Sequence, residues 1–351
     1  MITFLWRSDC HLADLPPQSR TDNWANTILG KLIEMGGIAR SVNAHAVLDG
    51  GDFFHVKSPV RNTHELVQRA AGVHATYPCP TFATIGNHDL KYGNQEYLHE
   101  SPLEVLFSTG VFGRLYDDFE VYFGSSQKNS PEVGAYPYDR AGEGWVNGRN
   151  PFPRKLEPIV RVVGIQYHGN RYDLNRFTTL VKGEEDFLVA VVHCCASPEG
   201  GTLFEKEDVL RYADLANMAP DVWLFAHYHI DQGIQKVGDK VFVNVGSVSR
   251  GALVQDNLER IPCCVSINFT KEGVTTTQHP LTVKPSEEVF DLVGRARAEG
   301  REMAIESFVE SLKETLMGER TTTAAEEVGE MKDIPDEVRE RTIFYLEQAG
   351  V

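Results

Sequence analysis

The sequence predicts an α/β fold, on three observations. Short apolar or β-branched runs alternate with amphipathic stretches through the first 230 residues, as in folds that combine sheets with covering helices. The runs are too short to be membrane helices, and several are followed directly by Asp, Asn or His. At 351 residues the chain has room for one large domain with an accessory region, or for two domains.

The predicted strands are short runs rich in Val, Ile, Leu and Phe. They are Ile2–Trp6, Ala46–Asp49, Thr81–Ile85, Ile159–Ile165, Phe187–Val192, Val222–Phe225, Lys240–Val245, Cys263–Phe269 and Val274–His279. The last three are closely spaced, as antiparallel strands are. Three amphipathic stretches predict helices, namely Asp22–Asn43, Thr63–His74 and Glu205–Ala216.

Two regions depart from this pattern. Residues 124–155 are rich in Gly, Pro, Asn, Ser and Tyr without a sustained period, which predicts a loop-rich insertion in a domain spanning residues 1–284. From Pro285 the chain turns helical and acidic, and residues 285–351 carry a net charge of −9 out of −16 for the whole chain. We therefore expect a separate C-terminal helical region.

This C-terminal region contains two predicted helices. One face of the first carries apolar side chains at helical spacing, namely Ile305, Phe308, Val309, Leu312 and Leu316. The second begins at Pro335 and carries Val338, Tyr345 and Leu346 on one stripe. The two helices either pack on a small core of their own or form a docking element for a partner.

Composition predicts a cytoplasmic protein without a membrane span. No apolar run approaches about 20 residues, and the opening Met1–Trp6 is too short for a signal peptide and runs into charged Arg7. The six cysteines lack C-x-x-C spacing, so we expect reduced thiols rather than a zinc knuckle or disulfides. The net charge of −16 argues against a free-standing nucleic-acid clamp, although bound cations would neutralise several acids.

Five polar motifs carry the chemistry, and each directly follows a predicted strand. In chain order they are Asp9-Cys-His11, Gly50-Gly-Asp52, Gly86-Asn-His-Asp89, His193 and His227-Tyr-His229. Each motif alone could have no function, because short triplets arise by chance and a single histidine is more often an ordinary polar residue. Side chains at the carboxyl ends of neighbouring strands converge on one crevice, so the five together predict a single site.

The donor types in these motifs suit divalent transition metals. Carboxylates, imidazoles and an amide oxygen form a mixed oxygen and nitrogen set that favours manganese, iron or zinc over calcium or a metal bound by thiolates. Cys10 and Cys194 each neighbour a proposed ligand. We expect neither to bind metal, because enough harder ligands are already present.

In order and residue type, these motifs resemble those of the calcineurin-like metallophosphoesterases. The resemblance covers roughly residues 1–280 and implies a sandwich of two mixed β-sheets flanked by helices, here with a C-terminal helical extension. More narrowly, the chain resembles the SbcD-type nuclease subunits of double-strand-break repair and phage recombination. Three segments carry that narrower resemblance: Gly51–His55 followed by Pro59, Val163–His168, and Asn244–Arg250 with Val245 in place of the usual proline.

The resemblance implies a dinuclear metal centre. One ion would be held by Asp9, His11, Asp52 and His229, and the other by Asp52, Asn87, His193 and His227. Asp52 would bridge the ions, giving one oxygen to each. Manganese is the metal expected first, with iron, zinc and magnesium as alternatives.

The resemblance also assigns roles beside the metals. His88 would protonate the leaving oxygen, with Asp89 holding its ring. His55 would help to seat the phosphodiester, or would only cap the following turn. Arg250 would contact substrate, or would pair with an acidic side chain.

Three functions are open at this point. The resemblance implies a DNA exonuclease or endonuclease with an SbcC-like ATPase partner that residues 286–349 would contact, and a homodimer is open as well. The alternative is a small-molecule phosphatase or cyclic-nucleotide phosphodiesterase. A non-catalytic scaffold is disfavoured because no ligand is missing and His88 is present. The tail has a thin apolar stripe and no separate DNA-capping domain is evident, so we expect a reduced, phage-like nuclease.

Overall fold

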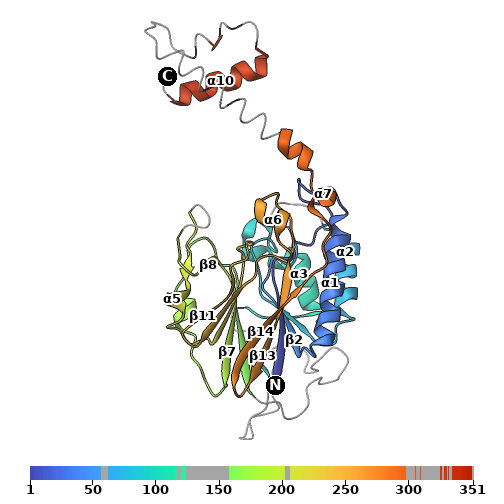
Figure 1. Ribbon diagram of the computed structural model, residues 1–351, viewed down its shortest axis with the longest axis vertical. Coiled ribbons are helices and arrows are strands. Elements are labelled where there is room, and N and C mark those ends of the chain that lie inside the picture. The colour runs from blue at the N-terminus through green and yellow to red at the C-terminus, as the bar shows by residue number, and fades with distance from the viewer. Residues whose placement is uncertain are drawn as a thin grey trace. The chain divides into compact units, whose positions relative to one another are not determined.

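The structure is a computed structural model. It describes residues 1–56, 62–116, 120–123, 158–201 and 206–297, together with 305, 309, 325, 328–329, 331 and 334–349. The chain forms two compact units, Met1–Phe290 and Asp291–Val351, whereas the sequence suggested a boundary after residue 284 (Figure 1). The predicted insertion at 124–155 and the residue Pro59 lie outside the described residues.

The first sheet of the larger unit has six strands in the order β14-β13-β1-β2-β3-β4. Strands β1 to β4 are parallel, whereas β13 is antiparallel to both β1 and β14. The bounds are β1 Ile2–Arg7, β2 Ala46–Asp49, β3 Thr81–Ala83, β4 Phe112–Arg114, β13 Cys263–Thr270 and β14 Gly273–Pro280. This sheet is therefore mixed, as expected.

The second sheet also has six strands, in the order β11-β12-β10-β7-β6-β5. Its four central strands are parallel, and the edge strands β5 and β11 are antiparallel to their neighbours. The bounds are β5 Glu120–Phe123, β6 Val160–Ile165, β7 Phe187–His193, β10 Val222–Ala226, β11 Gly233–Val237 and β12 Lys240–Asn244. The grouping of β12 with β13 and β14 was wrong, because β12 pairs with β10 and β11 in this sheet.

The larger helices cover the outer sides of the two sheets, whereas α6 Gln255–Glu259 and α7 Ser286–Val289 lie at one end of them (Figure 1). The other helices are α1 Trp24–Ser41, α2 His64–His74, α3 Pro102–Ser108, α4 Asn175–Thr178 and α5 Tyr212–Leu215, with the 3₁₀ helices η1 Lys91–Gly93 and η2 Gln95–Glu100. The two long predicted helices are confirmed. Each begins after a capping side chain, Asn23 for α1 and Thr63 for α2, that accepts a backbone N–H of the first turn.

The predicted helix Glu205–Ala216 was largely wrong. Within its described part, β9 Leu210–Arg211 pairs with β8 Ala196–Ser197, and only α5 is helical. The reason is that Asp208 accepts the backbone N–H of Tyr172 at 3.0 Å, which draws this segment into an extended path. Tertiary contacts therefore override the local helical pattern here.

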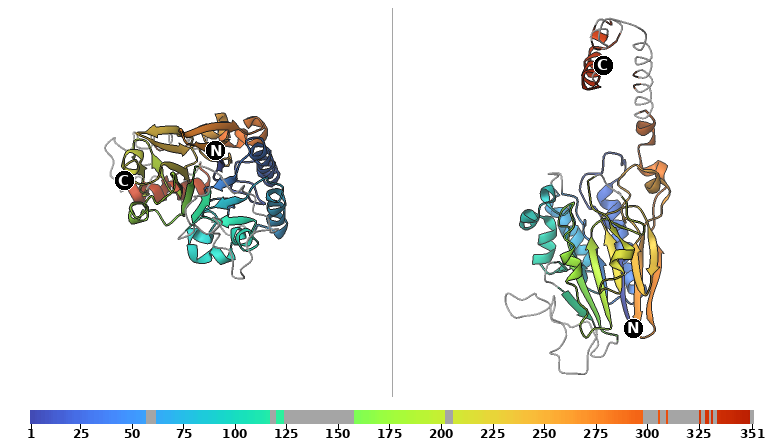
Figure 2. Two further views of the ribbon diagram at one scale, coloured as in Figure 1. Left: turned by 90° about the horizontal axis from the view of Figure 1, so that it is seen from below. Right: turned by 90° about the vertical axis from the view of Figure 1, so that its left-hand side faces the viewer.

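Three apolar layers hold the larger unit together. Leu48 and Phe82 from the first sheet meet Val191 and Leu224 from the second between the sheets. The opposite faces of the two sheets pack against helices, α1 to α3 on the first sheet and α5 on the second (Figures 1 and 2). Because both faces of each sheet are covered, the central strands are buried over almost their whole length and are mostly apolar. The result is the predicted two-sheet sandwich flanked by helices.

The smaller unit contains α10, Asp336–Ala349, which begins directly after Pro335 as predicted. Leu346 is buried with Val328 in a small apolar cluster, and Ile343 packs against it. Of the three residues of the predicted stripe only Leu346 is buried, whereas Val338 and Tyr345 are 43% and 55% exposed. Phe308, Leu312 and Leu316 lie outside the described residues.

Two further findings concern the whole described chain. No helix among the described residues is long and apolar enough to cross a membrane. All six cysteines are free thiols, as expected from their spacing.

Candidate metal centre

The seven predicted metal ligands come together at the carboxyl ends of strands from both sheets. They are Asp9 and His11 after β1, Asp52 after β2, Asn87 after β3, His193 at the end of β7, and His227 and His229 after β10. Their donor atoms form two groups that share Asp52. The convergence of strand ends thus assembles the site that the five motifs predicted.

The first ligand group consists of Asp9, His11, Asp52 and His229. His11 Nε2 lies 2.9 Å from His229 Nε2 and 3.7 Å from Asp52 Oδ2. His229 Nε2 lies 3.7 Å from Asp9 Oδ1. Burial lowers the pKa of His11, and lowers that of His229 to about 4, so both rings are neutral near pH 7 and can offer a lone pair to a cation.

The second ligand group consists of Asp52, Asn87, His193 and His227. Asn87 Oδ1 lies 3.2 Å from His193 Nε2 and 3.0 Å from His227 Nδ1. The two ring nitrogens are themselves 3.2 Å apart. Apart from the shared Asp52, this group is more deeply buried than the first, in which the His229 side chain is 39% exposed.

Asp52 joins the two groups through a single oxygen. Its Oδ2 lies 3.7 Å from His11 Nε2 and 3.5 Å from His193 Nε2, so that one atom faces both groups. Its Oδ1 accepts the backbone N–H of His88 at 2.6 Å. A carboxylate oxygen that accepts one N–H keeps a second lone pair, so the expectation that each oxygen serves one ion stays a prediction.

The donor set fits a pair of divalent cations. Imidazole nitrogens lie 2.9 Å apart in the first group and 3.2 Å apart in the second, close enough for both rings of a group to bind one cation. Carboxylate oxygens complete the first group, and the second has the Asp52 carboxylate and the amide oxygen of Asn87. Mixed oxygen and nitrogen ligands are those that manganese, iron and zinc accept.

Backbone strain is concentrated at this centre. Seven described non-glycine residues have a positive φ, and four of them are predicted ligands: Asp9, His11, Asp52 and His227. Such conformations cost roughly 1–3 kcal/mol each and persist where the surroundings impose them. Here the turns after β1 and β2 hold each other, since His11 N donates to Asp52 O at 2.8 Å and Asp9 N to Gly51 O at 3.1 Å.

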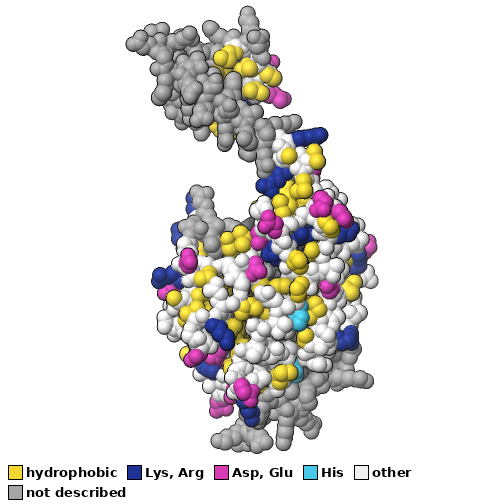
Figure 3. Space-filling view, in the orientation of Figure 1, with side chains coloured by type: hydrophobic (Ala, Val, Ile, Leu, Met, Phe, Trp, Pro, Cys, Tyr) yellow, Lys and Arg dark blue, Asp and Glu magenta, His cyan; other side chains and the backbone are white. Residues whose placement is uncertain are grey.

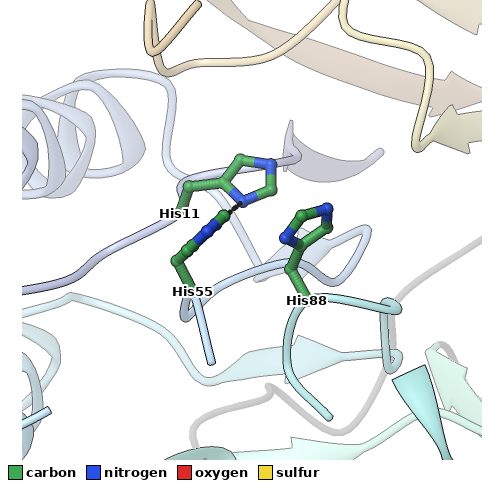
Figure 4. A group of neighbouring side chains, drawn as sticks. All are labelled: His11, His55 and His88. Carbon is green, nitrogen blue, oxygen red and sulfur yellow. Dashed lines mark hydrogen bonds between the residues drawn. The ribbon is translucent and has the colours of Figure 1, made fainter. Parts of the chain in front are cut away.

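His55 and His88 lie beside the first ligand group (Figure 4). Their rings are stacked with centroids 4.6 Å apart, and the His11 ring lies edge-on to His88 at 4.8 Å. His11 Nδ1 and His55 Nδ1 are 3.2 Å apart. With a cation on His11 Nε2, the proton of this ring would be on Nδ1 and would be donated to His55, whose own proton would then be on Nε2.

Asp89 has a different role from the one expected. Its carboxylate accepts the backbone N–H of Phe54 at 2.8 Å and that of Gly86 at 3.0 Å. These bonds fix the loop that carries Asn87 and His88, instead of contacting the His88 ring. Asp89 therefore acts on His88 through the backbone.

Arg250 is buried, and its guanidinium contacts the protein's own chain. Its guanidinium donates to the backbone carbonyls of Lys284 and Asn257, at 2.6 and 3.4 Å, and to Ser286 Oγ at 3.4 Å. This arrangement matches neither the substrate contact nor the acidic partner considered from sequence. Arg250 instead ties the loop after β12 to the chain before α7.

One residue of the centre was missed from sequence. Glu207 Oε1 lies 2.9 Å from His227 Nε2, the ring nitrogen that points away from the ligand group. The helical reading of this segment concealed it, and a lone carboxylate has no motif. The signal that could have found it is chemical, because a metal-ligating imidazole needs an acceptor for its other N–H.

A family model for calcineurin-like phosphoesterases matches residues 2–231. Two solved structures are similar in fold. A dimetal phosphatase from Danio rerio is 11% identical with a TM-score of 0.46, covering 80% of this chain and 96% of that one. A protein of Thermus thermophilus is 12% identical with a TM-score of 0.41, covering 79% of this chain and 98% of that one. No curated protein is significantly similar in sequence.

Proposed function

Because the chain belongs to the calcineurin-like phosphoesterase family, we propose that it hydrolyses phosphodiester bonds with two bound divalent metal ions, and that DNA is its substrate. The observation that carries this proposal is the stacking of His55 on His88 beside the ligand groups. Two imidazoles at one side of the centre can serve two different oxygens of a phosphodiester. Manganese is the ion we expect first.

When bound, the two ions supply Lewis acidity toward a phosphate oxygen and lower the pKa of a water molecule. His88 acts as the general acid that protonates the leaving oxygen. Its backbone N–H donates to Asp52 Oδ1, so His88 keeps a fixed position relative to the carboxylate that both groups share. His55, protonated on Nε2, donates to a phosphate oxygen that is not lost in the reaction.

Three considerations favour DNA over a small ester. The Gly51–His55, Val163–His168 and Asn244–Arg250 segments resemble those of SbcD-type nucleases. His229 is partly exposed, so the centre is accessible from the side of the first ligand group. On the face shown in Figure 3, basic and acidic side chains are interspersed, and the net negative charge forms no single continuous patch there. Reduced cysteines and DNA as substrate would place the protein in the cytoplasm.

The test offers the manganese-loaded protein several substrates side by side. They are labelled single-stranded and duplex DNA, a bis-nitrophenyl phosphodiester, a nitrophenyl phosphomonoester and a cyclic nucleotide. We expect both DNA and the phosphodiester to be hydrolysed, and both activities to be lost together in Asp52→Ala. Hydrolysis of the monoester or cyclic nucleotide without DNA would overturn the nuclease proposal and favour a small-molecule phosphoesterase.

We further propose that the C-terminal unit docks an SbcC-like ATPase. Phe344 and Tyr345 on α10 are 54% and 55% exposed and in contact with each other, as an aromatic anchor for a partner would be. A chain ending at Phe290 should still cleave the small phosphodiester while losing stimulation by the ATPase. An insoluble or metal-free truncated protein would show that this unit instead stabilises the enzyme's own fold.

A further inference from the structure

The ring of His227 must present a defined nitrogen to the second ligand group. Its Nδ1 faces Asn87 Oδ1 at 3.0 Å and His193 Nε2 at 3.2 Å, where a cation would be bound. A ligating imidazole nitrogen offers a lone pair, so the proton has to reside on Nε2. The question is therefore which group receives that proton's hydrogen bond.

Glu207 is placed to receive it. Glu207 Oε1 lies 2.9 Å from His227 Nε2, an ion-pair contact in which the N–H is not yet aligned on the oxygen, and the side chains of both residues are less than 10% exposed. The same carboxylate oxygen accepts the hydroxyl of Tyr172 at 2.6 Å. The Tyr172 hydroxyl in turn accepts the backbone N–H of Cys195 at 2.7 Å, so its own orientation is fixed.

Hydrogen bonds hold the segment that carries Glu207 on both sides of this residue. Asp208 N donates to Asn170 O at 2.9 Å, and the Asp208 carboxylate accepts Tyr172 N at 3.0 Å. Leu210 N donates to Cys195 O at 3.0 Å, continuing into the β8–β9 pair. Lys206, directly before Glu207, adopts φ 65°, which turns the chain so that the carboxylate points inward. A strained turn next to a buried carboxylate indicates a position that the fold imposes.

We propose that Glu207 is a positioning residue for the second metal, which fixes the ring and tautomer of His227 and is itself fixed by Tyr172. The proposal rests on the dinuclear assignment but not on DNA as the substrate. His193 is held in the same manner by a neutral group, since its Nδ1 lies 2.7 Å from Gly50 O. Glu207 differs in its charge, which makes the His227 Nδ1 lone pair a stronger donor to the cation.

A competing arrangement uses the same atoms. Cys195, Glu207 and His227 are close enough for one donor atom of each to surround a third ion. Such an ion would require His227 to bind cations through both ring nitrogens and therefore to lose the proton from both. The positioning role does not need that change, so we favour it.

The experiment measures metal binding in the full-length protein, independently of any substrate. Glu207→Ala, Glu207→Gln and Tyr172→Phe are compared with Glu199→Gln, a matched loss of an exposed carboxylate near the same loop. Bound metal is counted by elemental analysis, and the dissociation constant of each ion is obtained by competition with a chelator. The visible spectrum of the cobalt-loaded protein reports the geometry of the ligand field.

We expect Glu207→Ala to weaken one of the two ions by about 10–100-fold and to alter the cobalt spectrum, while the other ion is retained. Glu207→Gln keeps an acceptor without charge and should lie between Ala and the wild type, as should Tyr172→Phe. Glu199→Gln should bind metal as the wild type does. If Glu207→Ala fails to fold, Glu207→Gln and Tyr172→Phe still decide the question.

Two results would overturn the proposal. One is unchanged affinity and an unchanged cobalt spectrum in all three variants, which would leave Glu207 as an ordinary buried acid. The other is a wild-type protein with three tightly bound ions, one of which is lost in Glu207→Ala, because Glu207 would then be a ligand. Absence of DNA cleavage would affect the nuclease proposal alone, since none of these readouts uses DNA.

Discussion

The first ligand group is held mainly through its backbone, with His55 on the outer nitrogen of His11, whereas both imidazoles of the second group are held at their outer nitrogens. In the first group, Ser247 Oγ donates to Asp9 O at 2.8 Å, and Ser247 N donates to His229 O at 3.0 Å. Trp24 Nε1 donates to His11 O at 2.9 Å. In the second group, Gly50 O and Glu207 contact ring nitrogens of His193 and His227.

The loop that holds the first group is itself fixed by buried cations. Lys31 Nζ donates to Val248 O at 2.6 Å, Arg260 to Ser247 O at 2.8 Å, and Arg20 to Arg250 O at 2.9 Å. Gly246 in this loop has φ 68°, and a Cβ there would lie 2.3 Å from His229 O. Only glycine allows that approach.

The two ligand groups should therefore respond differently to substitution. Main-chain hydrogen bonds survive most side-chain substitutions. Metal binding by the first group should therefore be sensitive chiefly to substitution of glycines and of residues in the loop after β12. A ring held by one outer partner depends on that single side chain, so the second group should be sensitive there. The following predictions test this contrast, beginning with the largest effect.

Asp52→Ala should abolish metal binding and activity together, because Oδ2 faces both groups. This is the one substitution for which the two groups should not differ. Elemental analysis after gel filtration measures the outcome, with Glu199→Ala as the control. Two tightly bound ions in Asp52→Ala would contradict the shared-ligand assignment.

His88→Gln should leave both ions bound and slow hydrolysis of DNA by about 10²–10⁴-fold, because the general acid is lost. A nitrophenyl ester has a leaving group that needs little protonation, so its hydrolysis should fall much less. Rates on both substrates provide the measurement. Equal losses on the two would remove His88 from the acid role.

Gly86→Ala should displace Asp52, since a Cβ at this position would lie 2.1 Å from Asp52 Oδ1 and 2.4 Å from its backbone nitrogen. A displacement of about 1 Å at a catalytic group can lower turnover by about 100-fold. Gly72→Ala is the control, because its Cβ would meet nothing within 4 Å. Turnover and metal content similar in the two variants would argue against such close packing at Asp52.

Ser247→Ala should weaken metal binding only about fivefold, since of the bonds of its hydroxyl only the one to Asp9 O, of about 1 kcal/mol, holds a predicted ligand, while the backbone bonds remain. The comparison with Glu207→Ala is the direct test of the contrast between the groups. Chelator competition measures both variants under the same conditions. A loss in Ser247→Ala as large as that in Glu207→Ala would break the contrast.

Lys31→Met should change the pH dependence of stability while leaving both ions bound. Burial, and secondarily the positive charges of Arg250, Arg20 and Arg260, lower the pKa of Lys31 to about 7. Between that value and the ordinary pKa of about 10.4, the unfolded chain binds more protons at this residue. Wild-type stability should therefore rise with pH in this window relative to Lys31→Met. Urea unfolding from pH 7 to about 10 measures the difference, and parallel curves would contradict a depressed pKa at Lys31.

Nine strands and the candidate ligands that follow them could be predicted from the sequence, whereas the short strands β4, β5, β8, β9 and β11 were missed. Val, Ile and Leu runs such as those of β1 and β7 are buried on both faces, and their composition alone identifies them as central strands. Because ligand loops follow such strands directly, reading the strands also located Asp9, Asp52 and His193. The local sequence was sufficient wherever the residues that determine a structural feature lie within a few positions of one another.

The hydrogen-bond partners of these residues could be known only from the tertiary structure. Glu207 reaches His227 because the segment before α5 is drawn onto Tyr172 and Cys195, and no local periodicity encodes that path. Arg250 is likewise turned inward by the carbonyls of Lys284 and Asn257, although its position in the motif resembled a substrate contact. Hydrogen bonds between segments distant in sequence outweigh local preferences of a few tenths of a kcal/mol per residue, so these roles follow from the assembled fold.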